Sequence, residues 1–389
     1  MRPSFLSLAL CTTALALPFS IAGSNGAMGL IILALIWRSR TDGPRMAAAW
    51  RLEPALAALA LYAGAGLIAA LLSASPAASF RDAFKDWHRL AALGLFVAAL
   101  ELEPDAPLLA PLGISFAAMA LVGLWQSAQG GLGMTRAHAF VHPVVFGEQM
   151  ALAALGGACM LLRPADKVGS RAVWAFTALV FAAMVMSQTR MALIAAAAGF
   201  GLVILPEPRA RRWAVPALAV VAAVAVGWEL IPGNTRTLSS FFRHYDPSHN
   251  QQQSRLVLWD VAWRIFRDHP LTGAGPGGYG RLFTTYHEGA IEGQLGWGSA
   301  HNLYLHQLAE RGILGGFALL ALCATFLTRT VRAARGASDA RALWSAGAVA
   351  ALLAMCMTET AFQNEQFASL FLLIWAWGTV SLRARGENL

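Results

Sequence analysis

The chain has 389 residues, of which 57% are hydrophobic and only 13% are charged. Soluble domains carry about 25% charged residues, so this composition excludes an ordinary soluble globular protein. Apolar runs recur along the whole length, and several approach the roughly 20 residues that a helix needs to cross a bilayer. We therefore expect an all-α polytopic integral membrane protein.

The formal net charge is +8, and almost all of it comes from arginine, since Lys85 and Lys167 are the only lysines. A basic chain can indicate nucleic-acid binding. Here, however, much of the arginine lies in short loops between apolar runs, as is typical of cytoplasmic loops. We predict no nucleic-acid partner. The four cysteines lie inside apolar runs without CxxC spacing, so neither zinc nor disulfides are indicated.

Read in chain order, the apolar segments predict about twelve transmembrane helices. These cover residues 4–21, 27–37, 55–73, 90–102, 107–125, 144–162, 173–186, 191–205, 215–230, 312–327, 343–357 and 368–380. The even number and the arginine-rich inward loops place both termini on the cytoplasmic side, which in a Gram-negative bacterium is the cytoplasmic side of the inner membrane.

The connections between these spans are predicted as loops. Residues 38–51 are strongly basic and are expected on the cytoplasmic side, and residues 75–89 are expected as a polar loop on the outer side. Residues 101–105 are acidic where the charge rule favours basic residues. Acidic residues contribute little to that rule, so the topology is kept.

Residues 232–300 form the single long hydrophilic segment, which this topology places outside, and therefore in the periplasm if the cell is Gram-negative. The chain thus divides into spans 1–9 (residues 1–232), a periplasmic loop (233–300) and a motif helix with spans 10–12 (301–389). An amphipathic helix is predicted over residues 253–268, with Leu256, Trp259, Trp263 and Phe266 on one stripe that suits an interface or a packing face. The glycine-rich stretch 272–280 lacks the features of a nucleotide loop and is interpreted as a turn.

Arginine on the outward side is unexpected, because outward loops are usually poor in it. Arg190 is the clearest case, since spans seven and eight leave almost no loop around it. One interpretation is an interfacial arginine whose side chain reaches the lipid headgroups. The other is an anion-binding group, because the guanidinium fork pairs bidentately with phosphate.

His301 stands where the polar segment meets an apolar run, at a membrane–water boundary. An imidazole there can serve as a general base, or it can be a polar interfacial residue. His306 lies about 140° away on a helix, which argues against a paired metal site. His138 and His142 have i, i+4 spacing, but Pro143 makes a helix there unfavourable, so we predict no metal. Gly312 allows close approach of another helix.

Four pieces of sequence resemble the O-antigen ligase and polymerase superfamily, in the family's order. His301-Asn302 followed after nine residues by Gly312 is similar to the family signature. Residues 135–147 resemble its first outward-loop motif. Ser187-Gln188-Thr189-Arg190 resembles its mid-chain arginine motif, and residues 254–277 resemble its long-loop motif. The resemblance covers residues 135–316.

The resemblance implies glycosyl transfer from an undecaprenyl-diphosphate-linked glycan, at the periplasmic face and among membrane lipids. His301 would be the general base that takes a proton from the acceptor hydroxyl. The donor diphosphate would be held by Arg190 and Arg136, assisted by Arg255, Arg81 and Lys85, and Asn302, His142 and Gly312 would support the site. Fixed cations can stabilise the leaving group without a metal, so no cofactor is expected.

Three activities of this superfamily remain open. A ligase transfers the glycan to a lipid A-core sugar, a polymerase to another donor-linked repeat unit, and a protein O-oligosaccharyltransferase to Ser or Thr. The compact length and the close match to the His-Asn signature favour the ligase over the polymerase. A transporter of a lipid-linked anion is the alternative from another class, but it predicts binding groups near the bilayer midplane, whereas the polar groups here gather at one face.

Overall fold

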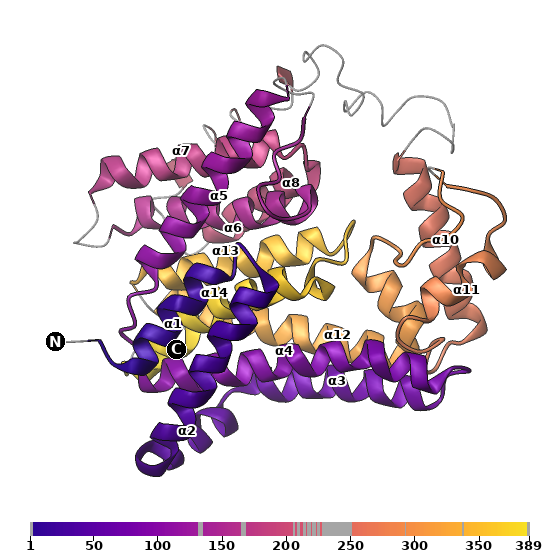
Figure 1. The fold of residues 1–389 in the computed structure, drawn as a ribbon, viewed down its shortest axis with the longest axis horizontal. Helices are drawn as coiled ribbons and strands as arrows, with labels where there is room; N and C mark the ends of the chain where they lie inside the picture. The colour runs from indigo at the N-terminus through magenta and orange to yellow at the C-terminus, as the bar shows by residue number, and fades with distance from the viewer. Residues whose placement is uncertain are drawn as a thin grey trace.

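The computed structural model describes residues 3–130, 135–164, 169–204, 207, single positions between 211 and 227, 251–291, 293–336 and 338–386. In these residues every regular element is a helix, and the one β contact is an isolated bridge (Figure 1). The helices are α1 (Phe5–Ala16), α2 (Ile21–Leu52), α3 (Pro54–Leu71), α4 (Pro76–Leu102), α5 (Leu109–Gln129), α6 (Pro143–Leu162), α7 (Ser170–Met186), α8 (Arg190–Ile204), α10 (Gln251–Asp268), α11 (Gly278–Tyr286), α12 (Leu303–Gly336), α13 (Ala340–Met355), η2 (Ala361–Gln363) and α14 (Glu365–Ala384).

The architecture is compatible with a polytopic membrane protein. Among the described residues, six helices are long and apolar enough to cross a bilayer, namely α2, α3, α5, α6, α12 and α14. Four further apolar helices, α1, α7, α8 and α13, are shorter. The predicted ninth span, residues 215–230, lies largely outside the described residues. The all-helical class is confirmed, and the count of twelve spans stays a prediction.

Most helix positions follow the hydropathy pattern, but two predicted loops are wrong. Residues 38–51 continue α2, and residues 76–89 form the first part of α4. Their polar side chains pair along the helices, Arg38 with Asp42 at 2.6 Å and Lys85 with Asp82 at 2.9 Å. Such i, i+4 and i, i+3 pairs stabilise exposed helix. In these two segments the polar residues show where the helix leaves its apolar surroundings. They do not show where the helix ends.

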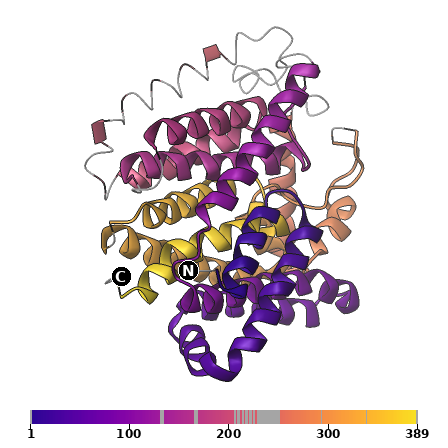
Figure 2. The ribbon, with the colours of Figure 1, turned by 60° about the vertical axis from the view of Figure 1, so that its left-hand side comes forward.

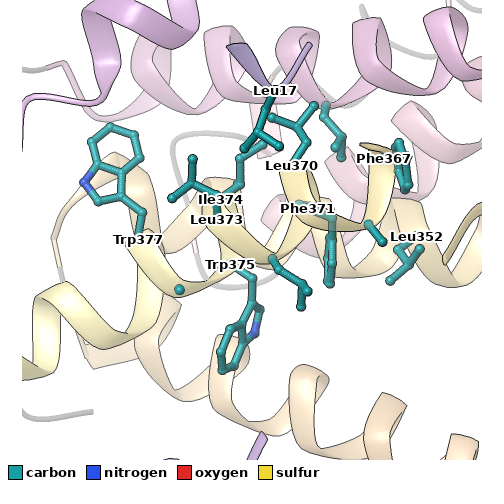
Figure 3. Close-up of a cluster of buried hydrophobic side chains, with 14 of the residues drawn as sticks. Leu17, Leu352, Phe367, Leu370, Phe371, Leu373, Ile374, Trp375 and Trp377 are labelled. Atoms are coloured by element: carbon teal, nitrogen blue, oxygen red, sulfur yellow. The ribbon is translucent and has the colours of Figure 1, made fainter. Parts of the chain in front are cut away.

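The helix α14 forms the centre of the bundle. Every residue from Gln366 to Leu382 is buried, as expected for a helix that is hydrophobic all round. Figure 3 shows side chains spreading from α14 in several directions, with Trp375 on a different side from Leu370. Phe326 of α12 packs edge-to-face on Trp375 at 5.0 Å. This contact fixes α12 against the centre of the fold.

Both described termini lie at one end of the bundle, which we call the terminal end. Ser4 hydrogen-bonds Glu103 at 2.8 Å, and Arg385 forms an ion pair with Asp105. Glu103 also pairs with Arg38 at 3.3 Å. The acidic stretch 101–105 therefore has a structural role, since its carboxylates bind arginines from α2 and from the C-terminal segment.

The opposite end, the His301 end, collects the motif segments. The helices run back and forth between the two ends, so the connections before α6, before α8 and after α13 meet there, beside the start of α12. Figures 1 and 2 show α10 and α11 beside this part of the bundle. The four segments that carry the resemblance are distant in sequence but lie at the same end of the molecule.

The amphipathic helix α10 forms where predicted, but its predicted stripe is not the buried face. Leu258, Val261 and Ile265 are buried in a second hydrophobic cluster with residues of α11. Leu256 and Trp263 are 58% and 47% exposed. The packing interpretation of the stripe is therefore wrong for these two residues. Which of the two apolar faces of α10 is buried depends on the residues of α11 that pack against it.

A break in α12 at Gly312 joins the long-loop motif to the signature motif. Gly312 has φ +59°, and its neighbour Ile313 donates to the Pro270 carbonyl at 2.8 Å. A Cβ at Gly312 would lie 2.4 Å from the Leu271 carbonyl carbon. Gly275 donates in turn to the Glu310 carbonyl at 2.9 Å. Gly312 thus allows close approach of a turn of backbone, not of a second helix as predicted. The glycine-rich stretch is a turn as far as Gly277, and its last three residues begin α11.

A buried ion cluster holds α12 beside this break. The Arg311 guanidinium, 2% exposed, pairs with Asp86 of α4 at 2.5 Å and lies 4.4 Å from the Tyr62 ring centre. Asp86 also pairs with Arg89 at 2.7 Å. A charge taken out of water requires such partners. The cluster therefore fixes α12 to α3 and α4 immediately before the break at Gly312.

Candidate active site

His301 is placed by the N-terminal cap of α12. The Asn302 side chain accepts the Leu305 backbone N–H at 3.1 Å, which is an N-cap contact. His301 therefore precedes the helix, and its φ of +47° lies in the left-handed region that non-glycine residues rarely adopt. Such strain is concentrated at functional sites. The Leu303 N–H, which donates to the Cys356 carbonyl at 2.8 Å, fixes the start of α12 against the end of α13.

The partner of His301 is Glu359, in the connection between α13 and α14. His301 Nδ1 lies 2.7 Å from Glu359 Oε2, and Arg255 Nη2 lies 2.5 Å from Glu359 Oε1. When Nδ1–H donates to the carboxylate, Nε2 is left as the proton acceptor. Burial would raise the pKa of Glu359. The hydrogen bond from His301 and the charge of Arg255 outweigh it and hold that pKa below its usual range, so the carboxylate is ionised.

Arg136 joins two of the resemblance motifs. Its Nε donates to the Ser187 carbonyl at 2.8 Å, and its Nη2 donates to Thr189 Oγ1 at 3.1 Å. Position 147 of α6 has room only for glycine, because a Cβ there would lie 2.6 Å from Ser187 Oγ. The segment 135–147 and the segment 187–190 therefore form one unit. Arg190, partly buried, begins α8 directly after Thr189.

His142 lies between this unit and His301. Its Nδ1 accepts the Val144 N–H at 3.3 Å and caps α6. Partial burial lowers the pKa of His142, and the charge of Arg136 lowers it further, while Glu359 opposes the shift. His142 is thus within electrostatic reach of both Arg136 and the pair formed by His301 and Glu359. The structure brings together His301, His142, Arg136 and Arg255.

Arg81 and Lys85 lie apart, on the exposed side of α4. Lys85 pairs with Asp82, whose carboxylate lies 3.7 Å from Arg281. Among the contacts of the described residues, none joins Arg81 or Lys85 to His301. Both lie near the start of α4, and therefore at the His301 end.

His306 and His138 do not join the site in the ways that would suggest metal. As predicted, His306 points elsewhere than His301: its Nε2 lies 3.5 Å from Glu310, and its ring packs on Tyr279. His138 lies in the irregular segment before α6, so it does not share a helix with His142. Within the described part of the chain, no three His, Cys, Asp or Glu side chains gather as metal ligands.

Sequence reasoning missed Glu359 and Trp297. Glu359 lies in the short connection between two apolar spans, and a carboxylate on the same side as His301 was the available signal. Trp297 packs edge-to-face with the His301 ring, with 5.5 Å between ring centres. Both residues touch the imidazole directly.

This arrangement defines a class of protein. A buried carboxylate orients a partly buried imidazole, a geometry that is typical of a general base. Arginines beside it are suited to an anionic substrate. Apolar helices surround this group, so the structure combines a bundle of span-like helices with an imidazole–carboxylate pair and arginines at one end.

The comparison with known families makes this class specific. Residues 175–320 match the family model described as O-Antigen ligase, and this stretch contains Arg190, Arg255, His301 and Gly312. The resemblance to the O-antigen ligase and polymerase superfamily is therefore confirmed over residues 175–320. The family indicates a ligase- or polymerase-type function. No curated protein gives a significant match to the chain.

Proposed function

We propose that the protein is an O-antigen ligase, which moves a glycan from undecaprenyl diphosphate to a sugar hydroxyl of lipid A-core at the periplasmic face of the inner membrane. The observation that carries the proposal is the His301–Glu359 contact of 2.7 Å, with Arg255 bound to the same carboxylate. An oriented base beside fixed cations is the machinery that transfer from a lipid diphosphate requires.

In the proposed reaction, His301 Nε2 takes the proton of the acceptor hydroxyl. The acceptor oxygen then forms a bond to the anomeric carbon, and the bond from that carbon to the diphosphate oxygen breaks. The diphosphate leaves with the electron pair and needs no proton. Ionised Glu359 stabilises the imidazolium that forms. A single displacement of this kind inverts the anomeric carbon.

Arg136 and Arg190 are proposed to bind the diphosphate, with Arg255 assisting. The Ser187 carbonyl and the Thr189 hydroxyl accept hydrogen bonds from Arg136 and orient its guanidinium. Cations positioned before the reaction lower its barrier most effectively, which supports a mechanism without metal. Arg81 and Lys85, exposed on α4, are proposed to attract the anionic donor from a distance.

The transporter alternative has less support. Transporters use broken membrane helices around a midplane site, and α12 is broken at Gly312. The carbonyls of Ala309 and Glu310 at this break accept N–H groups of Ala274 and Gly275. The break thus binds a turn of the same chain, which favours the enzyme.

The test is transfer by the purified full-length protein in lipid nanodiscs, supplied with an undecaprenyl-diphosphate glycan and a lipid A-core acceptor. We expect His301→Ala and Arg190→Ala to lower transfer by about 10²- to 10⁴-fold. The matched control is His287→Ala, at the end of α11. Full transfer by either of the two variants would refute the catalytic assignment.

Two further arms test the finer points. Supplying the donor glycan as the only acceptor separates a polymerase, which would lengthen it, from a ligase, which would not. Transfer that requires added divalent metal, and that EDTA abolishes, would overturn the metal-free mechanism.

A further inference from the structure

Trp297 is a partly buried aromatic residue in direct contact with His301. The two ring planes lie at 73°, and the ring centres are 5.5 Å apart. The indole Nε1 donates to the Ile291 carbonyl at 3.3 Å, which fixes the orientation of the ring. A side chain held in this way keeps its place whether or not a substrate is present.

The segment around Trp297 is built to hold the indole rigid and to leave part of it uncovered. The bridge between Ile291 and Gln294 closes a tight turn. Gly298 packs on Gly280 of α11, where an added Cβ would lie 3.3 Å from the Gly298 Cα. Gly296 and Gly298, on either side of Trp297, are exposed and carry no side chain that could cover it. The ring also packs against the cluster of α10 and α11.

We propose that Trp297 is the stacking platform for the sugar ring of the acceptor saccharide, the ring whose hydroxyl His301 deprotonates. This inference rests on the proposed function. One face of a pyranose ring presents C–H bonds, whose partly positive hydrogens suit the negative face of an aromatic ring. A hydroxyl within about 3 Å of His301 Nε2 brings its sugar ring within reach of an indole 5.5 Å from the imidazole.

Trp297 is better placed to bind the acceptor sugar than the donor sugar. The two main groups proposed to bind the diphosphate, Arg136 and Arg190, come from the connection before α6 and from the start of α8. The assisting Arg255 comes from α10 and is held by Glu359. Trp297 comes from the segment between α11 and α12. Displacement at the anomeric carbon brings the acceptor from the side away from the departing diphosphate. Trp297 lies in a segment that supplies neither of the two main phosphate-binding arginines, and it is therefore the better place for the acceptor sugar.

The first measurement is binding of core oligosaccharide, released from its lipid, to the full chain in nanodiscs without donor. We expect Trp297→Ala to weaken binding about tenfold and Trp297→Phe, which keeps an aromatic face, to weaken it less. The control is Trp263→Ala, which removes a tryptophan that is 47% exposed on α10 and packs on Phe266. Equal binding by wild type and both Trp297 variants would overturn the proposal.

The second measurement separates a platform from a residue that only positions His301. Trp297→Ala should raise KM for the acceptor about tenfold, with KM for the donor and the pH profile of kcat unchanged. A fall in kcat with a shifted pH profile and an unchanged acceptor KM would show a positioning role alone. A raised donor KM would place the platform on the donor side. If wild type binds the oligosaccharide through Trp297 but transfers nothing, the platform stands and the proposed function fails.

Discussion

Arginine has different partners at the two ends of this bundle. At the terminal end, Glu53 is 1% exposed and binds Arg329 of α12 and Arg383 of α14, each at 3.1 Å. At the His301 end, Arg136 is bound by a carbonyl and a hydroxyl, and the carboxylate of Glu359 is shared between Arg255 and His301. The terminal end ties helices together by charge. The His301 end also does so, through Asp86 with Arg311 and Arg89, and in addition it holds Arg255 and His301 on one carboxylate.

The comparison shows that ion pairs in this molecule serve different purposes at different places. Glu53 joins three parts of the chain that have no polar motif in common, so its loss should affect stability alone. Glu359 contacts the residue that the signature motif positions, so its loss should affect chemistry first. Variants at the two ends should therefore separate the free energy of unfolding from the rate of transfer.

The largest expected effect belongs to Glu359→Gln. The neutral amide cannot stabilise the imidazolium of His301, and we expect kcat to fall about a thousandfold with a small change in Tm. The measurement is transfer at saturating donor and acceptor. The matched control is Glu365→Gln, at the start of α14, where the carboxylate lies 3.3 Å from His88 and outside the proposed machinery. A Glu359→Gln protein that retains a third of wild-type kcat would contradict the role of this carboxylate.

Glu53→Gln should reverse the pattern. The substitution removes the negative charge that pairs with two arginines in a buried cluster, so their positive charges are neutralised only in part. We expect a loss of about 2–3 kcal/mol of unfolding free energy. The value lies below that of a fully buried pair because the two arginine side chains are 13% and 21% exposed. Thermal unfolding in detergent measures the loss, and kcat per folded molecule should stay at the wild-type level. If kcat falls as far as in Glu359→Gln, the comparison between the ends is wrong.

Gly312→Ala tests the junction between α12 and the turn at Pro270. The added methyl meets the Leu271 carbonyl group at 2.4 Å in a backbone with φ +59°, so both contact and conformation are unfavourable. We expect a loss of about 2 kcal/mol of unfolding free energy. Gly113→Ala in α5 is the control, because nothing lies within 4 Å of its added Cβ and alanine favours helix. Equal Tm values for the two variants would mean that the break adapts to a side chain.

Helix positions could be predicted to within a few residues wherever apolar runs alternate with short polar connections, as for α3 and α5 to α8. The polar ends of α2 and α4 could not. Hydropathy records the solvent around a residue, whereas helix continues through water when pairs such as Arg38 and Asp42 support it.

The site could be predicted in part, because its motifs are local and its contacts are not. The signature motif pointed to His301, and two other short motifs pointed to Arg136 and to the segment that ends in Arg190. That Arg136 contacts Thr189 could be learned only from the structure. Glu359 is 58 residues from His301 along the chain, a distance at which spacing carries no information about contact. Arg255 was expected at the diphosphate and is found on Glu359, a partner that only the folded chain reveals.

The smallest expected effect is a pH dependence carried by His142. Its pKa in the folded protein is below the ordinary value of 6.5 for histidine. Between those two values the unfolded chain binds more protons than the folded one, so stability is full above pH 6.5 and declines as the pH falls toward the lowered pKa. Because His142 remains exposed to water, the change in Tm should be small, about 1 °C.

The measurement is Tm between pH 7.5 and pH 5.5 for wild type and for His142→Asn, which keeps a cap acceptor and cannot titrate. The variant should lose part of the slope. Glu359 does not contribute to the change in Tm over this pH range. A carboxylate whose pKa is held below its usual range makes stability depend on pH only below about pH 4.5. An unchanged slope in His142→Asn would assign the titration to another group and would remove the evidence that His142 responds to the charge of Arg136.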